Sequence, residues 1–323
     1  MNRLHHLQET LPMNVLDYAD NENVEFVILD YNSTDGLELW MKNNLHSFAS
    51  KVVYYKTNQP QFYNRSHSRN MAFRLATGDV LINLDADNYA GKGFLEYIEK
   101  VFEQNQSVFM APQDESLSDT FGKIGMAKVD FLTVRGYDEI IKGYGFEDND
   151  IKNRLQNLGS KKVEYSQPAF LKAITHTEEE RIKNEFIYHH LQKIFVEKIS
   201  HQKAKILFVY QDNSYESAQI ADSIFTTFEN KDNFIKPLEV LNRYFMLDQS
   251  IEKGIFREDL VQNATQIKER ETIFSIINFY SQLTNKLRFM DNFHHQRIAV
   301  NEAGFGCGRV IKNFDESNPI ILS

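Results

Sequence analysis

The chain has 323 residues with 36 lysines and arginines against 45 aspartates and glutamates, which gives a formal net charge of −9 with histidine neutral. This length fits one large domain or two ordinary ones, and 42% hydrophobic residues are enough to build a sizeable core. The acidic balance, without any basic run, argues against a general nucleic-acid binder. The single cysteine, Cys307, excludes an intrachain disulfide framework and a multi-cysteine metal cluster.

No apolar run approaches the roughly 18 to 20 residues of a membrane span, and the first residues lack the apolar region of a signal peptide. We therefore expect a cytoplasmic protein without a transmembrane segment. Peripheral association with a membrane stays open.

Up to about residue 165, short β-rich runs alternate with helix-length amphipathic runs, a pattern typical of an α/β domain with a largely parallel sheet. The expected strands are 24–30, 51–56, 79–84 and 108–111, and a helical pattern follows each of the first three. The spacing of Ile151, Leu155 and Leu158 predicts a further helix over 147–158 that ends at Gly159.

Thr177 and Glu180 have the spacing of a capping box and predict the start of a long amphipathic helix. We place a domain boundary near residue 200, so that residues 1–200 form the α/β domain and residues 201–323 a second region of unknown role. In that region Lys205–Tyr210 has the pattern of a strand, whereas most of 214–295 has helical patterns. The C-terminal region is therefore expected to be smaller and mainly helical.

Two aspartates, Asp85 and Asp87, follow the expected strand 79–84. Because strand side chains alternate, positions two apart project to one face, and these carboxylates are expected to meet at the carboxyl edge of the sheet, where open α/β sheets bind ligands. Two oxygen donors with room for waters and phosphates suit Mg²⁺ or Mn²⁺. The alternative is an ordinary solvated strand end, since so short a pattern is common.

The segment 131–155 combines glycines, aromatic rings and carboxylates. Its glycines allow close backbone approach, and Tyr144 offers a flat face of the kind on which sugars stack. Glu147 and Asp148 then open the helix predicted over 147–158. A carboxylate at this position can accept a proton from a hydroxyl in a water-poor cleft, or it can simply complement the helix dipole.

Four motifs in a fixed order carry a family resemblance: D-Y-N-S-T-D-G, S-R-N-M-A, G-D-V-L-I-N-L-D-A-D, and G-Y-D-E followed by G-Y-G-F-E-D-N-D. Together they cover roughly residues 2–180 and resemble the GT-A glycosyltransferases of family 2. From Phe131 onward the chain looks most like the C-terminal catalytic part of the β-1,4-galactosyltransferase group. The resemblance implies a GT-A fold, in which a mixed sheet flanked by helices binds a nucleotide-diphospho-sugar.

The resemblance also assigns residues to the nucleotide and the metal. Asp30 is similar to the acidic residue that binds the uracil ring, and Arg69 to a basic residue that lines the nucleotide site. Asp85 and Asp87 resemble the D-x-D pair, the first nearer the ribose and the second on the metal. His176 lies where the galactosyltransferase group has a metal-ligating histidine after the helix, and a surface histidine in a loop is the alternative.

Further residues are assigned to the acceptor side. Asp148 resembles the catalytic base of the family's E-D pair, with Glu147 beside it and Tyr144 as a sugar-stacking ring. Tyr144 stands where the galactosyltransferase run has a tryptophan, and Phe146 where it has a glycine. These departures leave the identities of donor sugar and acceptor open.

These roles imply an inverting, metal-dependent glycosyltransferase that uses Mn²⁺ or Mg²⁺. It would move a hexose, such as galactose or N-acetylgalactosamine, from a nucleotide-sugar, expected to be a UDP-sugar, to a glycan or lipid-linked acceptor in polysaccharide biosynthesis. One alternative is a non-catalytic sugar-binding or scaffold protein derived from such an enzyme. A nucleotidyltransferase is another, but it would carry a Gly-rich, basic loop after its first strand, which the sequence lacks.

Members of the resembling family place an apolar strand immediately before the Asn2-Arg3-Leu4 element, and no such strand precedes it here. We therefore expect a gap in the sheet between 24–30 and 79–84. Unpaired backbone groups in an interior cost about 1 to 3 kcal/mol each. We expect this gap to be filled by an upstream strand or by Lys205–Tyr210, or to be closed by direct approach of the two neighbouring strands.

Overall fold

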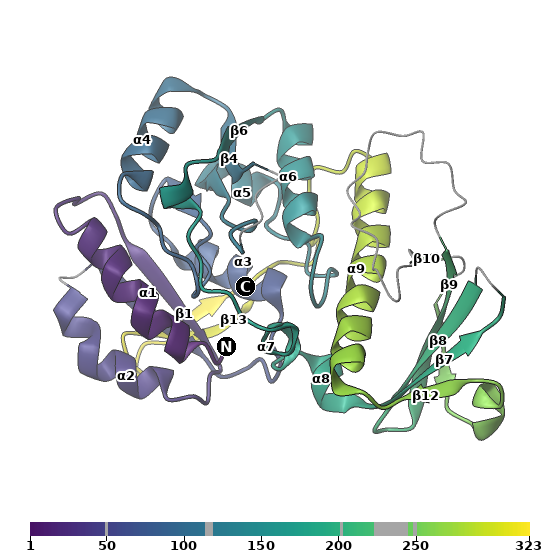
Figure 1. Ribbon diagram of the computed structural model, residues 1–323. Helices are drawn as coiled ribbons and strands as arrows, with labels where there is room; N and C mark the ends of the chain where they lie inside the picture. The colour runs from purple at the N-terminus through teal and green to yellow at the C-terminus, as the bar shows by residue number, and fades with distance from the viewer. Residues whose placement is uncertain (49–50, 114–118, 201–202, 223–244, 248–250) are drawn as a thin grey trace. The chain divides into compact units, whose positions relative to one another are not determined.

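The computed structural model describes residues 1–48, 51–113, 119–200, 203–222, 245–247 and 251–323 (Figure 1). These residues form two compact units: the first unit consists of Met1–Thr177 and Asn285–Ser323, and the second unit of Glu178–Thr284. The division differs from the boundary expected near residue 200, because the last part of the chain returns to the first unit.

The first unit contains two four-stranded sheets. In one, β1 (Phe26–Tyr31) pairs in parallel with β2 (Val52–Thr57), and β13 (Gly308–Lys312) and β14 (Ile320–Leu322) extend it in antiparallel pairing. In the other, the order is β3-β5-β4-β6, with bounds Val80–Ile82, Gly125–Ala127, Val108–Pro112 and Lys161–Tyr165. Here β4 and β6 run parallel, and the other pairs run antiparallel.

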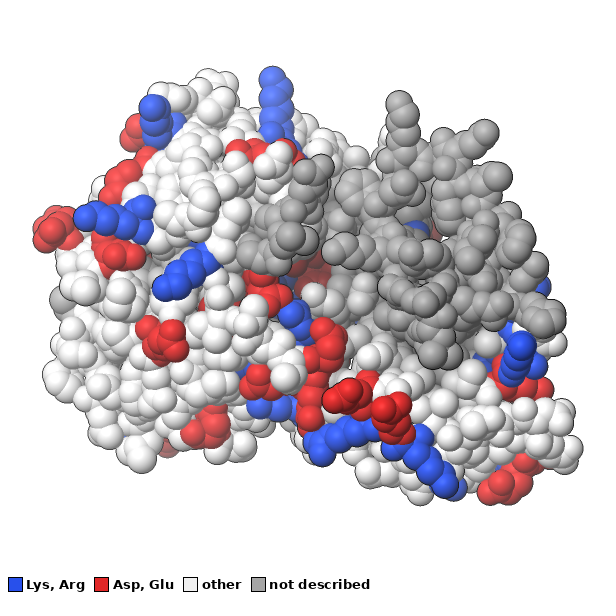
Figure 2. All heavy atoms as spheres, in the orientation of Figure 1, with Lys and Arg blue, Asp and Glu red and all other residues white. Residues whose placement is uncertain are grey.

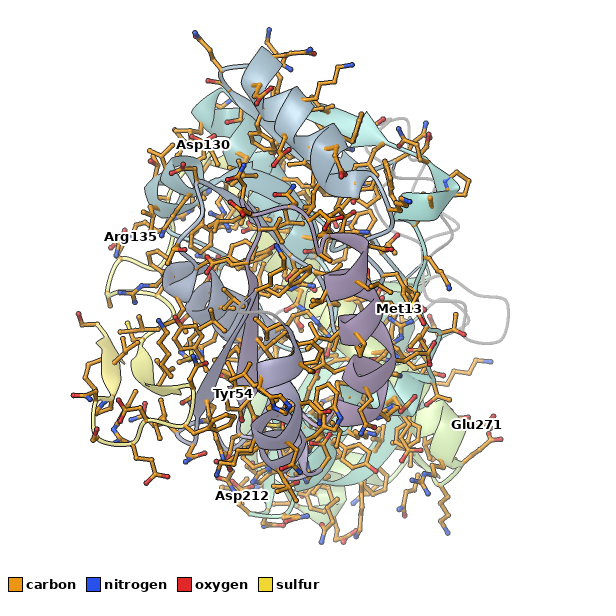
Figure 3. The ribbon with its side chains drawn as sticks, turned by 90° about the vertical axis from the view of Figure 1, so that its left-hand side faces the viewer. Met13, Tyr54, Asp130, Arg135, Asp212 and Glu271 are labelled. Atoms are coloured by element: carbon orange, nitrogen blue, oxygen red, sulfur yellow. The ribbon has the colours of Figure 1, made fainter. Side chains whose placement is uncertain are left out.

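Helices flank these sheets (Figure 1). Their bounds are α1 Leu4–Asp17, α2 Leu37–Asn44, α3 Arg65–Leu75, α4 Phe94–Gln104, α5 Lys128–Thr133 and α6 Glu147–Leu158, with 3₁₀ turns at Leu45–Phe48 and Pro168–Phe170. The apolar faces of α1 and α2 pack on β2, where Figure 3 labels Tyr54. The helix predicted over 147–158 and its end at Gly159 are confirmed. Mixed sheets flanked by helices confirm the expected fold class.

The expected gap in the sheet is present in the described part of the chain. β1 pairs with β2, β3 pairs with β5, and no described strand pairs with the other edge of either. Side chains from both edges, including Phe26, Val80 and Ile82, pack against one apolar cluster. Lys205–Tyr210 lies within β8 (Lys203–Tyr210) of the second unit, so the alternative in which it fills the gap is wrong. Both edges of β8 are already paired, with β7 and β9.

The described residues of the second unit are built on an antiparallel sheet, so the expectation of a mainly helical region after residue 200 is wrong for them apart from the helix over 270–294. Residues 223–244 and 248–250, which are also expected to be helical, lie outside the described residues. The strand order of the sheet is β10-β9-β8-β7-β12, and β11 also pairs with β9. The bounds are β7 Leu191–Lys198, β8 Lys203–Tyr210, β9 Ser214–Asp222, β10 Phe245–Leu247, β11 Glu252–Ile255 and β12 Thr265–Ile267, with helices α7 Glu178–Ile182, α8 Phe186–His190 and α9 Arg270–His294 and a 3₁₀ turn at Glu258–Val261.

The long helix predicted from Thr177 is also wrong, because two short helices are followed by β7 at Leu191. Ile194, Ile206 and Phe208, on β7 and β8, share one apolar cluster with residues of α9. Burying that face against the helix stabilises an extended conformation, so tertiary packing overrides the local helical period.

Helix α9 belongs to both units, since the first unit resumes at Asn285. The part of α9 in the first unit supports the loop before α6. Asn285 Nδ2 donates a hydrogen bond to Gly145 O at 2.9 Å, and Asn292 Nδ2 donates to Asp138 at 3.0 Å and to Asp150 at 2.7 Å. Residues assigned to a separate C-terminal region by sequence therefore help to position the segment that carries Asp148.

None of the helices in the described ranges is long and apolar enough to cross a membrane. On the face shown in Figure 2, acidic and basic side chains of the described residues are intermixed. That face therefore carries no uniform charge.

Candidate active site

The two aspartates of the D-x-D motif lie in a turn rather than on a strand. β3 ends at Ile82, so the alternation of strand side chains does not extend to Asp85 and Asp87. Asn83 Nδ2 donates to Asp85 Oδ1 at 3.1 Å, whereas Asp87 Oδ1 accepts a hydrogen bond from Asn88. The two carboxylates consequently have different partners.

Helix α1 stabilises this turn through hydrogen bonds from two polar side chains spaced four residues apart. Thr10 Oγ1 donates to Ala86 O at 2.7 Å, and Asn14 Nδ2 donates to Asn88 O at 3.1 Å. Asn14 Oδ1 also accepts a hydrogen bond from the Ala90 N–H at 2.7 Å. No family motif includes these two residues; the only signal for their contacts in the sequence is a pair of polar positions on one face of α1.

Arg69, on α3, is buried at the centre of a group of carboxylates, of which Glu147 and Asp148 are buried and Asp85 is partly exposed. Its Nη1 is 2.7 Å from Asp148 Oδ1, and its Nη2 is 3.2 Å from Asp85 Oδ2. Glu147 Oε1 lies 3.6 Å from Nη1. The guanidinium also covers the ring of Tyr137, at 5.3 Å from the centroid. We call Arg69, Asp85, Glu147 and Asp148 the Arg69 cluster, which brings together three motifs that are far apart in the sequence.

Burial and the charge of Arg69 have opposite effects on the pKa values of two carboxylates in the Arg69 cluster. Burial raises the pKa of Asp148 to about 6 against the opposing charge of Arg69, and the neighbouring carboxylates add to the rise. Burial also favours the neutral form of Asp85, but Arg69 and a hydrogen bond from Asn83 outweigh it, so the pKa of Asp85 is lowered. Asp148 is therefore suited to take up a proton near neutral pH, while Asp85 stays ionised.

Asp87 and His176 form a pair that is separate from the Arg69 cluster. His176 Nε2 lies 2.7 Å from Asp87 Oδ2, and the two side chains are buried, so His176 is not a surface histidine. Their segments are joined by hydrogen bonds from the Tyr89 N–H to Lys172 O at 3.0 Å and from the Ile174 N–H to Asp87 O at 2.8 Å. His176 Nδ1 is buried without a hydrogen-bond partner among the described residues. The contact between an imidazole nitrogen and a carboxylate brings together two kinds of ligand that a divalent cation such as Mn²⁺ accepts.

Asp30 lies at the carboxyl end of β1 and is fully buried. Its carboxylate accepts hydrogen bonds from Tyr54 Oη at 2.7 Å and from the Ser33 N–H at 2.8 Å. Its bonds among the described residues thus go to these two groups rather than to the Arg69 cluster. The carboxyl end of a strand in an α/β sheet is the usual place for a ligand.

The loop before α6 holds Tyr144 in a half-buried position. The Arg65 guanidinium lies over its ring, 5.2 Å from the centroid, and Arg65 Nη1 donates to Gly143 O at 2.8 Å. One face of the ring is therefore covered, which leaves at most the other face for a sugar. Tyr137, the other tyrosine of this segment, is fully buried beneath Arg69.

Gly122 borders the Arg69 cluster, although no motif marks it in the sequence. A Cβ atom added to Gly122 would lie 2.7 Å from Arg69 Nη2, 3.0 Å from Asp148 Oδ2 and 3.4 Å from Asp85 Oδ2. The three charged groups therefore pack directly against this glycine and leave no room for a side chain.

Residues 2–153 match the family described as glycosyl transferase family 2. Among solved structures, S. aureus TarS 1–349 is similar at 16% identity and a TM-score of 0.44 over 56% of this chain and 59% of that chain. A Drosophila β1,4-galactosyltransferase 7 mutant in complex with manganese, UDP-Gal and xylobiose is similar at 15% identity and a TM-score of 0.35, over 50% of this chain and 75% of that one.

A longer S. aureus TarS structure is similar at 15% identity and a TM-score of 0.44, over 55% of this chain but 36% of that chain. The chain therefore spans well under two thirds of the TarS structures that it resembles. No curated protein matches it. The match of residues 2–153 to glycosyltransferase family 2, together with the mixed sheets flanked by helices of a GT-A-like fold, confirms the resemblance drawn from the motifs.

The position of Gly122 predicts that Gly122→Ala lowers glycosyl transfer by roughly tenfold or more, because the new methyl group would push Arg69 away from Asp148. Gly125→Ala is the matched control, since a Cβ there would meet Ile82 and Met110 at 3.7 Å, an ordinary contact. The measurement is nucleotide release from a panel of nucleotide-sugars. Equal losses in the two variants would contradict the prediction.

The raised pKa of Asp148 predicts that kcat/KM rises as the pH increases through about 6. Below this pH the carboxyl group is protonated and cannot accept a proton; above it the group is ionised, so activity is lost on the acid side. The test is a kcat/KM profile from roughly pH 5 to 8, in which Asp148→Asn should remove the acid limb from any residual activity. A profile that is flat over this range would argue against Asp148 as the base.

Proposed function

We propose that the protein is an inverting glycosyltransferase that uses Mn²⁺ or Mg²⁺ to transfer a hexose, such as galactose or N-acetylgalactosamine, from a UDP-sugar to a hydroxyl group of a glycan or lipid-linked acceptor. The observation that carries the proposal is the shared guanidinium of Arg69, which pairs with Asp148 at the start of α6 and with Asp85 of the D-x-D turn. That arrangement supports a base next to the motif proposed to hold the leaving diphosphate, as a displacement at one carbon requires.

In this reaction Asp148 accepts the proton of the acceptor hydroxyl. The hydroxyl oxygen forms a bond to the anomeric carbon while the bond from that carbon to the diphosphate breaks, and the diphosphate departs with the electron pair. Burial supports this role, because the pKa of Asp148 is raised to about 6 and the base is then matched to a neutral working pH. One such base is enough for inversion, since the acceptor itself is the nucleophile.

Asp85, Asp87 and His176 are the residues proposed to hold the cation. The cation would supply positive charge that stabilises the leaving diphosphate. Carboxylate oxygens and one imidazole nitrogen are a donor set that suits Mn²⁺. The site supports a cation with open positions, because the diphosphate oxygens and waters would complete its coordination.

Asp30 is proposed to bind the uracil ring, and Tyr144 with Glu147 to contact the acceptor or the transferred sugar. The buried carboxylate of Asp30 has lone pairs beyond the two used by Tyr54 and Ser33, so it can accept a hydrogen bond from the ring N–H. Glu147 is 4% exposed and its Oε2 has no partner among the described residues, which supports a polar ligand close to it.

Asp148→Asn is expected to lower kcat by roughly 10² or more while donor binding changes little, because the amide keeps a hydrogen-bond acceptor for Arg69 but cannot take the proton. Glu147→Gln is the matched control, since Glu147 is the adjacent buried carboxylate of the same cluster. Transfer kinetics and UDP-sugar affinity are both measured. Normal transfer by Asp148→Asn combined with loss in Glu147→Gln would move the base to Glu147.

The cation proposal predicts that Mn²⁺ raises the affinity for UDP in the parent protein and raises it little or not at all in Asp87→Ala. Asp79→Ala, which removes an exposed carboxylate from the start of the same motif, should behave like the parent. His176→Ala should weaken the metal effect more mildly, because other ligands remain. Calorimetric titrations with and without Mn²⁺ measure the effect. The same dependence on Mn²⁺ in the parent and in Asp87→Ala would rule out this cation site.

A further inference from the structure

We propose that Lys123 is a positioning residue for the cation site: its buried ammonium group holds together the two peptide segments that carry Asp87 and His176. The inference rests on the proposed function, since these two side chains are two of the three proposed cation ligands. Lys123 belongs to none of the family motifs, and its role follows from its contacts alone.

The three N–H donors of the Lys123 ammonium are all used by backbone carbonyls of these segments. Lys123 is 1% exposed, and its Nζ donates to Tyr89 O at 2.8 Å, to Ala90 O at 2.9 Å and to Phe170 O at 2.7 Å. Tyr89 and Ala90 follow the D-x-D turn directly, and Phe170 lies on the segment that leads to His176. The Lys123 ammonium group thus joins the segment that carries Asp87 to the segment that carries His176.

The two segments approach each other so closely that their geometry depends on specific contacts. Gly91 has a φ of +87°, and a Cβ added to it would lie 2.1 Å from Ala169 O, so the backbones touch at this point. Asn88 and Ala173 form an antiparallel bridge further along. The Lys123 ammonium binds near Gly91, at the opposite end of this short ladder from the pair of Asp87 and His176.

The charge of Lys123 is solvated by the protein backbone rather than by a carboxylate. Nζ also lies 4.2 Å from the ring centroid of Phe94, and none of the ion pairs in the described ranges involves Lys123. Burial lowers the pKa of Lys123 to about 7, while the three carbonyl dipoles favour the charged form. An apolar side chain would fill the same space without the cost of desolvating a charge. The ammonium therefore adds directional contacts that packing alone would not supply.

The test compares Lys123→Met with Tyr165→Phe. Tyr165 is buried in the same region and its hydroxyl donates to Lys123 O at 2.6 Å, so its loss removes a hydrogen bond without touching the ammonium. Hydrogen exchange of the Tyr89 and Ile174 amides reports the contact between the segments. UDP affinity with and without Mn²⁺ reports the site, and the gain from Mn²⁺ should fall by about 10- to 100-fold in Lys123→Met, as is usual when support for a metal ligand is lost.

We expect exchange at the two amides to increase in Lys123→Met beyond any change in global stability, and to stay near the parent rate in Tyr165→Phe. Unchanged protection in Lys123→Met, or equal effects of the two variants, would overturn the proposal. If Lys123→Met does not fold, Lys123→Gln carries the same measurements, and failure of both to fold would also overturn it by assigning Lys123 to core stability. If the two amides exchange faster in Lys123→Met but Mn²⁺ does not raise the UDP affinity of the parent protein, the cation proposal is refuted. The role of Lys123 in holding the two segments together would then still stand.

Discussion

The neutralisation of the buried Arg69 guanidinium is the constraint on which the first unit depends. Arg69 is 6% exposed, and its partners come from the D-x-D turn and from the start of α6. Removing a partner from a buried ion pair typically costs about 3 to 5 kcal/mol, because a charge is then left uncompensated. The turn, α3 and α6 are therefore tied to one another. The carboxylates stand in position before any ligand binds, which is the condition for electrostatic preorganisation.

Loops as long as those around this site need hydrogen-bond partners for their backbone groups, and polar side chains from distant parts of the chain supply them. Thr10 and Asn14 of α1 bind the backbone of the D-x-D turn, and Asn285 of α9 binds the loop before α6. Arg154 adds a fully buried contact to Asp150 within α6. The end of α9 thus belongs to the site in physical terms, although it lies far beyond the family motifs.

The site has two halves with different chemistry, and one short segment touches both. The Arg69 cluster contains a carboxylate whose pKa is raised, as proton transfer requires, whereas Asp87 and His176 form the pair proposed to bind a cation. Gly122 borders the first half, and the side chain of the next residue, Lys123, supports the second. A shift of this segment would therefore change the spacing between the proposed base and the proposed cation ligands, which matters because displacement needs closely aligned reacting atoms.

The sequence by itself determined the features that depend on neighbouring residues: the strand near 24–30, the helix 147–158 with its end at Gly159, and the order of the motifs. Apolar period, capping and turn residues are encoded locally, so they can be recognised without a fold. Only the tertiary structure decided which carboxylate faces Arg69 and which faces His176, and that β8 and β9 form an antiparallel pair within a sheet. These outcomes depend on hydrogen bonds and burial between segments far apart in the chain. Lys123 is the clearest case. Its burial depends on three backbone carbonyls that accept hydrogen bonds from its ammonium group, and these carbonyls come from segments distant in the sequence, so no local pattern predicts the contact.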